Sequence, residues 1–338
     1  MDIKAALNKI AERQDLTGEE MRAVMRIIMA GEATPSQIGA FLMGMRIKGE
    51  SVGEIAAAVS ILREQMVPVA APDNAIDIVG TGGDGVGSLN ISTATALVVA
   101  AAGVPVAKHG NKALSSRSGS SQALEALGVK LDLTPAEIGD TIAKVGIGFM
   151  FAPAHHPAMR HAGPARAELG VRTLFNLLGP QSNPAGVRRY LLGVYSPQWV
   201  EPVAAALLAN RATKAWVVHS SEGLDELSTS GPNFVAQIAD GDLRSFEIHP
   251  EQVGLTLTDP KDLLGGDPAD NAAAIVALLE GAPGAYRDTV LLNAGAALVV
   301  ADRAANIEDG IEQARAAIDS GKASDTLARL VAVSNGRA

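Results

Sequence analysis

Cysteine is absent from this chain of 338 residues, and aromatic residues make up only 3% of it. The first absence excludes disulfides, thiolate nucleophiles and zinc sites built on cysteine, and it permits a reducing compartment. Because aromatics are scarce, alanine, valine, leucine and isoleucine have to fill the core. Positive charge is also short, with 28 Lys and Arg against 37 Asp and Glu and a net charge of -9. This balance argues against a protein that clamps nucleic acid, but it allows a local basic pocket.

Long apolar runs are missing as well. The longest, residues 94–107, is interrupted by Thr95, Gly103 and Pro105 and is too short to cross a bilayer. Residues 1–6 are polar and amphipathic and lack the apolar stretch of a signal peptide. Hydrophobic residues nevertheless reach 47% of the chain, which is enough for a large core. We therefore expect a soluble, cytoplasmic protein with no membrane partner and with enough chain for two domains.

Residues 1–69 carry helix signals and no residue pattern that suggests chemistry. Three helix starts are marked by an N-capping hydroxyl, two of them with a glutamate three residues further on: Thr17 with Glu20, Ser51 with Glu54, and Thr34 before Pro35. Apolar residues then recur at helical spacing from residue 55 to residue 66. We predict a small all-helical domain over residues 1–69, joined by part of residues 160–185, that serves packing or dimerisation.

The pattern changes after the proline-marked connection at residues 67–72. Short β-branched runs predict strands at residues 76–79, 104–107, 147–150, 191–195 and 216–218. Helical patterns lie between them at residues 92–102, 121–127 and 135–145. A hairpin is predicted around Asp240-Gly241, and Ala-rich helices follow from residue 267. The alternation predicts an α/β domain over residues 70–338, with a mostly parallel sheet flanked by helices and ligands at the carboxyl ends of its strands.

The strongest chemical feature is a run of five glycines within residues 80–87, directly after a predicted strand. Glycine lets the backbone adopt positive φ and turn successive N–H groups toward phosphate oxygens. Residues 90–93 follow, where Ser92 could cap the next helix and add the partial positive charge of a helix N-terminus. The spacing fits neither a dinucleotide fingerprint nor a Walker loop. A flexible turn is the plain alternative, and we favour a phosphate site.

Two further clusters fit the same ligand. Residues 108–120 hold three cations and four serines after another predicted strand, which suits several negatively charged oxygens, although basic serine-rich loops are also common surface features. Asp225 and Glu226 follow the strand predicted at residues 216–218. Adjacent carboxylates beside a phosphate pocket suit Mg²⁺, whereas away from such a pocket they are an ordinary exposed turn. The three loops together predict a metal-chelated phosphate ligand.

Histidines gather at residues 155–161, with Arg166 and Arg172 downstream. Zinc is disfavoured because a metal site would need further ligands at suitable spacing. Histidine and arginine beside small residues suit an aromatic substrate that bears a carboxylate. An ordinary helix start at Pro157 explains the same residues equally well. On composition alone both interpretations stay open.

In this order, the clusters resemble the anthranilate phosphoribosyltransferase family, which has the nucleoside phosphorylase/phosphoribosyltransferase-like fold. The matching segments are GTGGDG at 80–85, NIST at 90–93, KHGNKALSSRSGS at 108–120, HHPAMRH at 155–161, GVRTLFNLLGP at 170–180 and GLDE at 223–226. The resemblance implies transfer of the phosphoribosyl group of 5-phosphoribosyl 1-pyrophosphate to the amine of anthranilate, with Mg²⁺, in the second step of tryptophan biosynthesis from chorismate. It also implies a hinged helical domain and a homodimer joined through it.

The resemblance also implies roles for individual residues. Mg²⁺ would be served by Ser92, Asp225 and Glu226, and anthranilate would meet Gly80, Asn111, His155 and Arg166. The sugar donor would be held by a larger set from the first two loops: Gly80, Gly83, Asp84, Ser88, Asn90, Ile91, Ser92, Thr93, Lys108, His109, Gly110, Asn111, Lys112, Ala113, Leu114, Ser115, Ser116 and Ser120. No catalytic residue is assigned, and His109 is a candidate to accept the spare proton late in the reaction.

Two departures from the family pattern stand out. Gln122 occupies a position where the family commonly has Asp, and residues 180–184, PQSNP, replace the usual leucine and threonine. We expect both to tune the enzyme without removing its activity. Two other functions remain as alternatives, a pyrimidine-nucleoside phosphorylase and a non-catalytic relative that binds nucleic acid. The motif set speaks against the first, and the net charge of -9 together with the retained Asp225-Glu226 speaks against the second.

Overall fold

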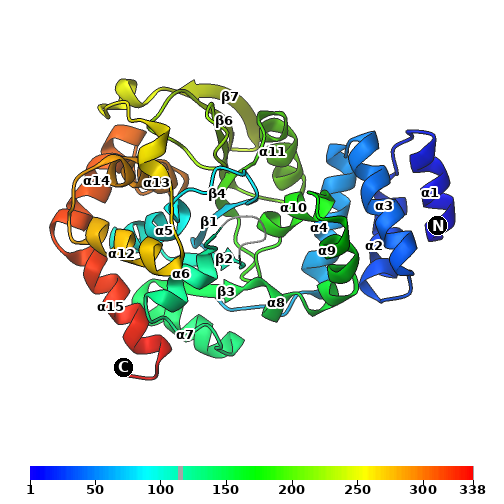
Figure 1. The fold of residues 1–338 in the computed structure, drawn as a ribbon, viewed down its shortest axis with the longest axis horizontal. Coiled ribbons are helices and arrows are strands. Elements are labelled where there is room, and N and C mark those ends of the chain that lie inside the picture. Colours follow the sequence, from blue (N-terminus) through cyan, green and yellow to red (C-terminus); the bar gives the residue numbers. More distant parts are fainter. Residues whose placement is uncertain (113–116, 338) are drawn as a thin grey trace.

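A computed structural model of the chain describes residues 1–112 and 117–337. The predictions for Ala113, Leu114, Ser115 and Ser116 therefore lie outside the described residues. The chain begins with four helices at one end of the molecule (Figure 1): α1 (Ile3–Ala11), α2 (Gly18–Met29), α3 (Pro35–Lys48) and α4 (Val52–Gln65). Thr17, Thr34 and Ser51 each accept a backbone N–H at the start of α2, α3 and α4, so the three predicted caps are confirmed.

The rest of the chain is built around one seven-stranded sheet of order β3-β2-β1-β4-β5-β6-β7. Strands β1 to β5 are parallel, and β6 and β7 form an antiparallel hairpin at one edge. The predicted α/β class and the predicted hairpin are thus both confirmed. The strands are β1 (Ile76–Gly80), β2 (Val106–Gly110), β3 (Ile147–Phe151), β4 (Arg189–Gly193), β5 (Lys214–Ser220), β6 (Asn233–Ala239) and β7 (Asp242–Ile248).

One strand lies later in the sequence than predicted. Strand β2 begins at Val106, not at Val104, because Pro105 has no N–H to offer a neighbouring strand. Its carbonyl instead accepts the N–H of Ile76, at 3.0 Å, where β1 begins. As a consequence Lys108 and His109, which were expected in a loop after the strand, belong to β2 itself. Their side chains are therefore fixed by the sheet.

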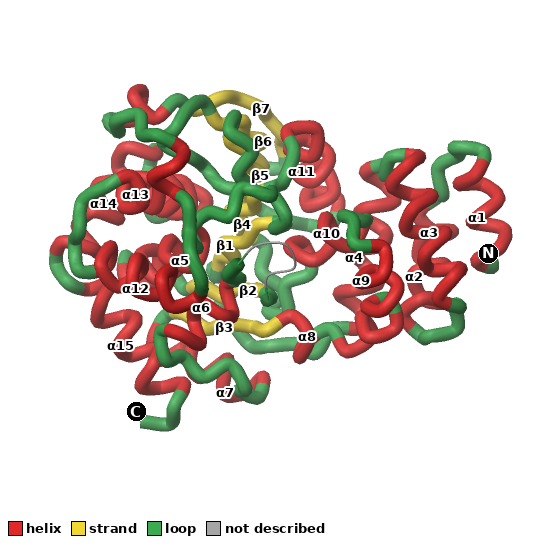
Figure 2. Tube along the Cα trace, viewed as in Figure 1, coloured by secondary structure: helices red, strands yellow, loops and turns green. Residues whose placement is uncertain are grey.

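Helices cover both faces of the sheet (Figure 2). Side chains alternate along each central strand, so that Val79 and Leu192 join one buried cluster while Ile78 and Leu191 join another. The first cluster runs on into the N-terminal helices, and the second packs against α5 and α13. The helices are α5 (Ile91–Ala101), α6 (Ser120–Ala126), α7 (Pro135–Val145), α8 (Ala152–His155), α9 (Gly163–Leu169), α10 (Leu174–Leu178), α11 (Val200–Ala209), α12 (Pro268–Leu279), α13 (Ala285–Val300), α14 (Ile307–Asp319) and α15 (Lys322–Ser334).

Polar contacts fix α4 to the α/β part. The guanidinium group of Arg63 donates to the backbone oxygen of Gln181, at 2.9 and 2.7 Å, and to the hydroxyl of Tyr190 at 3.1 Å. The side chain of Gln181 is fully buried, and its amide donates to Leu177 at 2.8 Å. One departure from the family pattern is therefore part of this anchoring segment. No helix among the described residues is long and apolar enough to cross a membrane.

Candidate functional site

The glycine-rich loop after β1 lies where the strand order reverses, because β1 has β2 on one side and β4 on the other. Ligands of such sheets bind outside the carboxyl ends of the strands at this point. Four glycines of the loop, Gly82, Gly83, Gly85 and Gly87, have φ between 65° and 82°, a conformation that other residues rarely adopt. The loop is thus an ordered turn of glycine backbone, as the phosphate hypothesis requires.

The carboxylates predicted to serve a metal reach this loop and the first turn of α5. Asp225 Oδ2 accepts the N–H of Gly82 at 2.6 Å, and Glu226 Oε1 accepts the N–H of Ser92 at 3.2 Å. A Cβ atom at Gly80 would overlap the Asp225 carboxylate, and one at Gly193 would overlap the Asp225 backbone. Glycine at the ends of β1 and β4 therefore makes room for this pair. Residues about 140 positions apart in the sequence are brought together as predicted.

The pKa values of both carboxylates are strongly raised. Each is 8% exposed, and burial raises the pKa of Asp225 to about 7 and that of Glu226 to about 8. The neighbouring Asp84 adds to the shift at Asp225, and Asp225 adds to the shift at Glu226. Among the described residues neither carboxylate forms a salt bridge within 4.0 Å. Such a buried, crowded pair is a functional-site signal and calls for a cation.

Helix α5 starts at the same place, but its predicted cap is wrong. Asn90 is the capping residue, no side chain caps the helix, and Ser92 lies inside the first turn. The side chain of Asn90 is used otherwise, since its Oδ1 accepts from Asn271 at 2.8 Å and from the hydroxyl of Ser118 at 3.2 Å. In the first turn the N–H of Ile91 bonds the backbone oxygen of Leu89 at 2.8 Å and that of Ser92 bonds Glu226, so the helix carries the partial positive charge of its N-terminus beside the carboxylate pair. This favours an anion there.

Lys108 reaches the site from β2 and is almost fully buried, at 2% exposure. Its ammonium group donates to the backbone oxygen of Ile78 at 2.6 Å. Burial lowers the pKa of Lys108, and the nearby Asp77, Glu226 and Asp225 oppose that shift. The three acidic residues favour the protonated lysine, which would place a positive charge beside the loop. The structure thus supports an anion-binding place for Lys108.

Sequence reasoning missed Asp77, which is fully buried in β1. Strands β1 and β2 pair in register at Ile76 with Val106, and past that pair the side chain of Asp77 connects the two strands. Asp77 accepts the N–H of His109 at 3.1 Å and the side-chain amide of Asn183 at 2.7 Å. Burial raises the pKa of Asp77 to about 6, against the pull of Lys108. An acidic residue inside an otherwise apolar strand was the available signal.

His109, His155 and His156 are buried, and the side chain of His109 points to the face of β2 opposite that of Lys108. The rings of His109 and His156 lie 5.1 Å apart, and Nδ1 of His155 lies 3.0 Å from the backbone oxygen of Val67. Burial lowers the pKa of all three, to about 4 for His156 and well below the ordinary value for His109. At neutral pH these rings are uncharged. His109 is therefore a weak proton acceptor.

The guanidinium group of Arg166, on α9, lies against an aromatic ring. Its guanidinium carbon lies 5.2 Å above the ring of Phe175, and burial lowers its pKa. It forms no salt bridge with another described residue, so a partly buried positive charge is left for a ligand. At the other departure from the family pattern, the Gln122 side chain accepts the N–H of Gly119 at 3.1 Å and so helps to start α6. Gln122 therefore has a structural contact of its own.

No group of three or more His, Asp or Glu side chains in the described part of the chain is placed to hold a metal ion by itself. Mg²⁺ is commonly bound by one or two carboxylates together with phosphates of the substrate. Asp225 and Glu226 are the residues whose burial and mutual repulsion match that need. Nδ1 of His155 already contacts the backbone oxygen of Val67, so this contact gives no support to a zinc site at residues 155–161.

Comparisons with known proteins agree with this geometry. The profile described as "Glycosyl transferase family, a/b domain" matches residues 72–324, and "Glycosyl transferase family, helical bundle domain" matches residues 4–66. A curated anthranilate phosphoribosyltransferase of Parvibaculum lavamentivorans is 58% identical over 336 residues, covering 99% of this chain and 98% of that protein. Another of Brucella canis is 56% identical over 334 residues, with coverage of 99% and 98%.

Solved structures point the same way. The crystal structure of anthranilate phosphoribosyltransferase from Thermus thermophilus matches with a TM-score of 0.93 and 45% identity, covering 99% of this chain and 100% of that one. The enzyme from Saccharomyces cerevisiae in complex with PRPP and Mg matches with a TM-score of 0.90 and 25% identity, covering 99% and 98%. The fold of both the N-terminal helices and the α/β part is thus similar to that of enzymes named anthranilate phosphoribosyltransferase.

Proposed function

This chain belongs to the anthranilate phosphoribosyltransferase family, and we propose how its own residues divide the work of that activity. The reaction transfers the phosphoribosyl group of 5-phosphoribosyl 1-pyrophosphate to the amine of anthranilate. The bond from ribose C1 to the diphosphate oxygen breaks, a bond from C1 to the amine nitrogen forms, and the amine loses one proton. This is the step of tryptophan biosynthesis that the resemblance implied, and the two alternative functions are set aside.

The observation that carries the assignment of the site is the carboxylate pair. Asp225 and Glu226 lie 8% exposed against the glycine loop and the first turn of α5, and burial raises both of their pKa values. Two negative groups beside an anion-binding loop make sense when a divalent cation joins them to the anion. Asp225 and Glu226, with Ser92 beside them, would hold Mg²⁺ that also contacts the diphosphate. When bound, Mg²⁺ would neutralise charge that develops on the leaving pyrophosphate.

The chain's own groups bind and orient the donor. The backbone of the loop, with Gly80, Gly83 and Asp84, holds the diphosphate, and Ser88 and residues 90–93 extend that hold toward the ribose. Lys108 supplies a buried positive charge, and the donor set is completed by His109 and Gly110 on β2, Asn111 and Lys112 directly after it, and Ser120 at the start of α6. Fixed donors aimed at a developing negative charge stabilise it by a few kcal/mol each, roughly, when water is excluded. The part assigned to residues 113–116 lies outside the described residues and stays a prediction.

Anthranilate meets the opposite side of the ribose. Arg166, stacked on Phe175 and without a carboxylate partner in the described part of the chain, is the residue for the anthranilate carboxylate, and Asn111, His155 and Gly80 complete the set. The aromatic amine is a neutral nucleophile, so no strong base has to activate it. His109, whose pKa burial holds well below its ordinary value, does not act as that base. Water takes the proton after the new bond has formed.

The decisive experiment follows anthranilate fluorescence in the presence of 5-phosphoribosyl 1-pyrophosphate and Mg²⁺. The wild-type chain consumes anthranilate, and the variant Asp225→Asn/Glu226→Gln loses about a hundredfold or more of its turnover and needs more Mg²⁺. A matched control changes the exposed adjacent pair on α14, Glu308→Gln/Asp309→Asn, which should leave turnover unchanged. An unchanged Mg²⁺ dependence in the first variant would reject the site.

The assembly and the compartment belong to the same proposal. We propose a homodimer joined through residues 1–69, acting in the cytoplasm, with residues 70–338 as the catalytic domain. What supports the dimer is exposed apolar surface, since Ile47 on α3 is 64% exposed and Val171 is 41% exposed. Arg46 of α3 also contacts the backbone oxygen of Arg172, the residue after Val171. Light scattering of the wild-type protein and of Ile47→Glu measures this directly, and a monomeric wild type would reject it.

A further inference from the structure

The glycine loop is held from two sides in the structure. On one side Asp225 accepts the N–H of Gly82 at 2.6 Å. On the other side the guanidinium group of Arg172 donates to the backbone oxygen of Gly83. The two contacts fix consecutive glycines of a loop in which Gly82, Gly83, Gly85 and Gly87 have positive φ. The conformation of this loop therefore depends on Arg172 as well as on the carboxylate.

Arg172 lies between α9 and α10 and is itself fixed by two further contacts. Its guanidinium carbon lies 4.5 Å above the ring of Tyr195, which follows β4. The backbone N–H of Tyr195 donates to the hydroxyl of Thr81, at 3.0 Å, so the residue that carries the stacked ring is hydrogen-bonded to the start of the same loop. The guanidinium thus touches the glycine loop directly at Gly83 and indirectly through Tyr195.

The N-terminal helices take part in the same chain of contacts. The guanidinium group of Arg46, near the end of α3, donates to the backbone oxygen of Arg172 at 2.7 Å. Glu50 lies close by, since its charge contributes to the raised pKa of Tyr195 after burial, and Arg172 opposes that shift. A continuous path therefore leads from α3 through Arg172 to the loop assigned to the diphosphate.

We propose that Arg172 is a positioning residue through which α3 sets the shape of the glycine loop for the diphosphate of the sugar donor. This inference rests on the proposed assignment of the diphosphate to that loop. Arg172 acts through Gly83, and it is not required to touch the substrate. When Arg46 keeps the backbone of Arg172 in place, the guanidinium keeps the Gly83 carbonyl turned aside and leaves the loop N–H groups free for phosphate oxygens.

Steady-state kinetics distinguish this role from a structural one. For Arg172→Ala we expect KM for 5-phosphoribosyl 1-pyrophosphate to rise about tenfold or more, because a contact to a charged donor is lost, while KM for anthranilate stays within about twofold. Arg166→Ala, six residues earlier, should do the reverse and raise KM for anthranilate. Arg46→Ala should raise KM for the donor by a smaller factor. Equal effects of Arg172→Ala on both KM values would overturn the proposal.

Two further variants separate positioning from direct phosphate binding. Lysine keeps the charge but has no planar fork to stack on Tyr195 and bond Gly83 at once, so Arg172→Lys should remain defective. Recovery of wild-type KM in Arg172→Lys would show a plain charge contact and overturn the proposal. In the double variant Arg46→Ala/Arg172→Ala, the effect of Arg46→Ala should vanish because both changes act on one path. Full additivity would likewise contradict it.

Folding and the assignment of the site are controlled separately. If Arg172→Ala does not fold, as judged by its thermal midpoint, Arg172→Gln and Arg46→Ala give the same comparison of KM values. The variant Asp225→Asn/Glu226→Gln reports on the proposed function alone. If that variant leaves the Mg²⁺ and donor dependence unchanged, the site assignment fails. If it is defective while Arg172→Ala and Arg172→Gln keep wild-type KM for the donor, only the role of Arg172 is rejected.

Discussion

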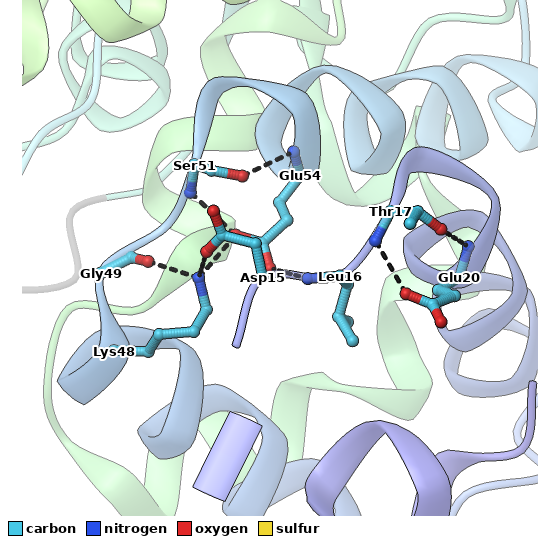
Figure 3. A network of polar contacts seen from close by, with 8 residues as sticks. All are labelled: Asp15, Leu16, Thr17, Glu20, Lys48, Gly49, Ser51 and Glu54. Atoms are coloured by element: carbon cyan, nitrogen blue, oxygen red, sulfur yellow. Dashed lines mark hydrogen bonds and ion pairs between the residues drawn. The ribbon is translucent and has the colours of Figure 1, made fainter. Parts of the chain in front are cut away.

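A buried ion pair in the N-terminal helices gives the sharpest stability prediction (Figure 3). The carboxylate of Glu54, which is 0% exposed, accepts the N–H groups of Leu16 and Ser51 and the ammonium of Lys48, each at 2.8 Å. The Lys48 side chain is itself only 3% exposed and also reaches Asp15 at 2.6 Å. Burial alone would lower the pKa of Lys48, but the hydrogen bonds to Asp15 and Glu54 raise it. The cluster therefore depends on the negative charge of Glu54.

The change Glu54→Gln removes that charge with almost no change of shape. One amide oxygen can still accept the N–H of Leu16, but the amide nitrogen then faces Ser51 and Lys48, which are also donors. Lys48 is left with the mostly exposed Asp15 and the backbone oxygen of Gly49, at 2.7 Å, as its partners. Removing one member of a buried pair typically costs about 3 to 5 kcal/mol. We expect a loss of that size in the free energy of unfolding.

The same sequence pattern occurs on α2 and supplies the control. Glu20 accepts the N–H of Thr17 at 2.8 Å and the ammonium of Lys9 at 2.7 Å, but its side chain is 23% exposed. Water can replace what Glu20→Gln loses, so that variant should be destabilised much less. Urea unfolding followed by far-UV circular dichroism compares the two. If Glu54→Gln costs no more than Glu20→Gln, burial of the pair is not what makes it important.

Two further predictions concern the site. The pKa values of Asp225 and Glu226 are raised to about 7 and about 8, so the substrate-free folded protein binds protons that the unfolded chain has released. Its stability should therefore decrease as the pH rises from about 4 toward 8. Mg²⁺, in contrast, needs both carboxylates deprotonated. The Mg²⁺ concentration needed for half-maximal activity should therefore decrease as the pH rises from about 6 to about 8.5. A concentration that does not change with pH would contradict this. Asp77→Asn puts an amide donor against His109 or Asn183 and removes the charge facing Lys108. It should cost about 3 kcal/mol in urea unfolding and raise KM for the donor, and wild-type values for both would refute that role.

The sequence allowed good prediction of features that depend on neighbours along the chain. The caps at Thr17, Thr34 and Ser51 were correct because an N-cap involves residues three apart. The Asp240-Gly241 hairpin was correct for the same reason, since both residues adopt positive φ. The mostly parallel sheet with helices on both faces followed from the alternation of predicted strands and helices along the chain.

Features that depend on distant residues were not predictable. Ser92 was expected to cap α5, but its backbone N–H bonds Glu226, 134 positions later, and Asn90 takes the capping position. The role of Asp77 needs Asn183, which comes from a segment 106 positions away. The contact of Arg172 with Gly83 crosses 89 positions. Such partners are chosen by the packed fold, so the residue types alone suggest them only as possibilities.

The central claim is that the Asp225-Glu226 pair joins the donor's diphosphate to the glycine loop through a divalent cation. Crystals grown with Mn²⁺ in place of Mg²⁺ and with 5-phosphoribosyl 1-pyrophosphate test it most directly, because Mn²⁺ gives an anomalous signal. The account predicts a peak at about 2.1 Å from carboxylate oxygens of this pair, in contact with the diphosphate. A cation bound elsewhere, or a diphosphate bound away from residues 80–87, would contradict it.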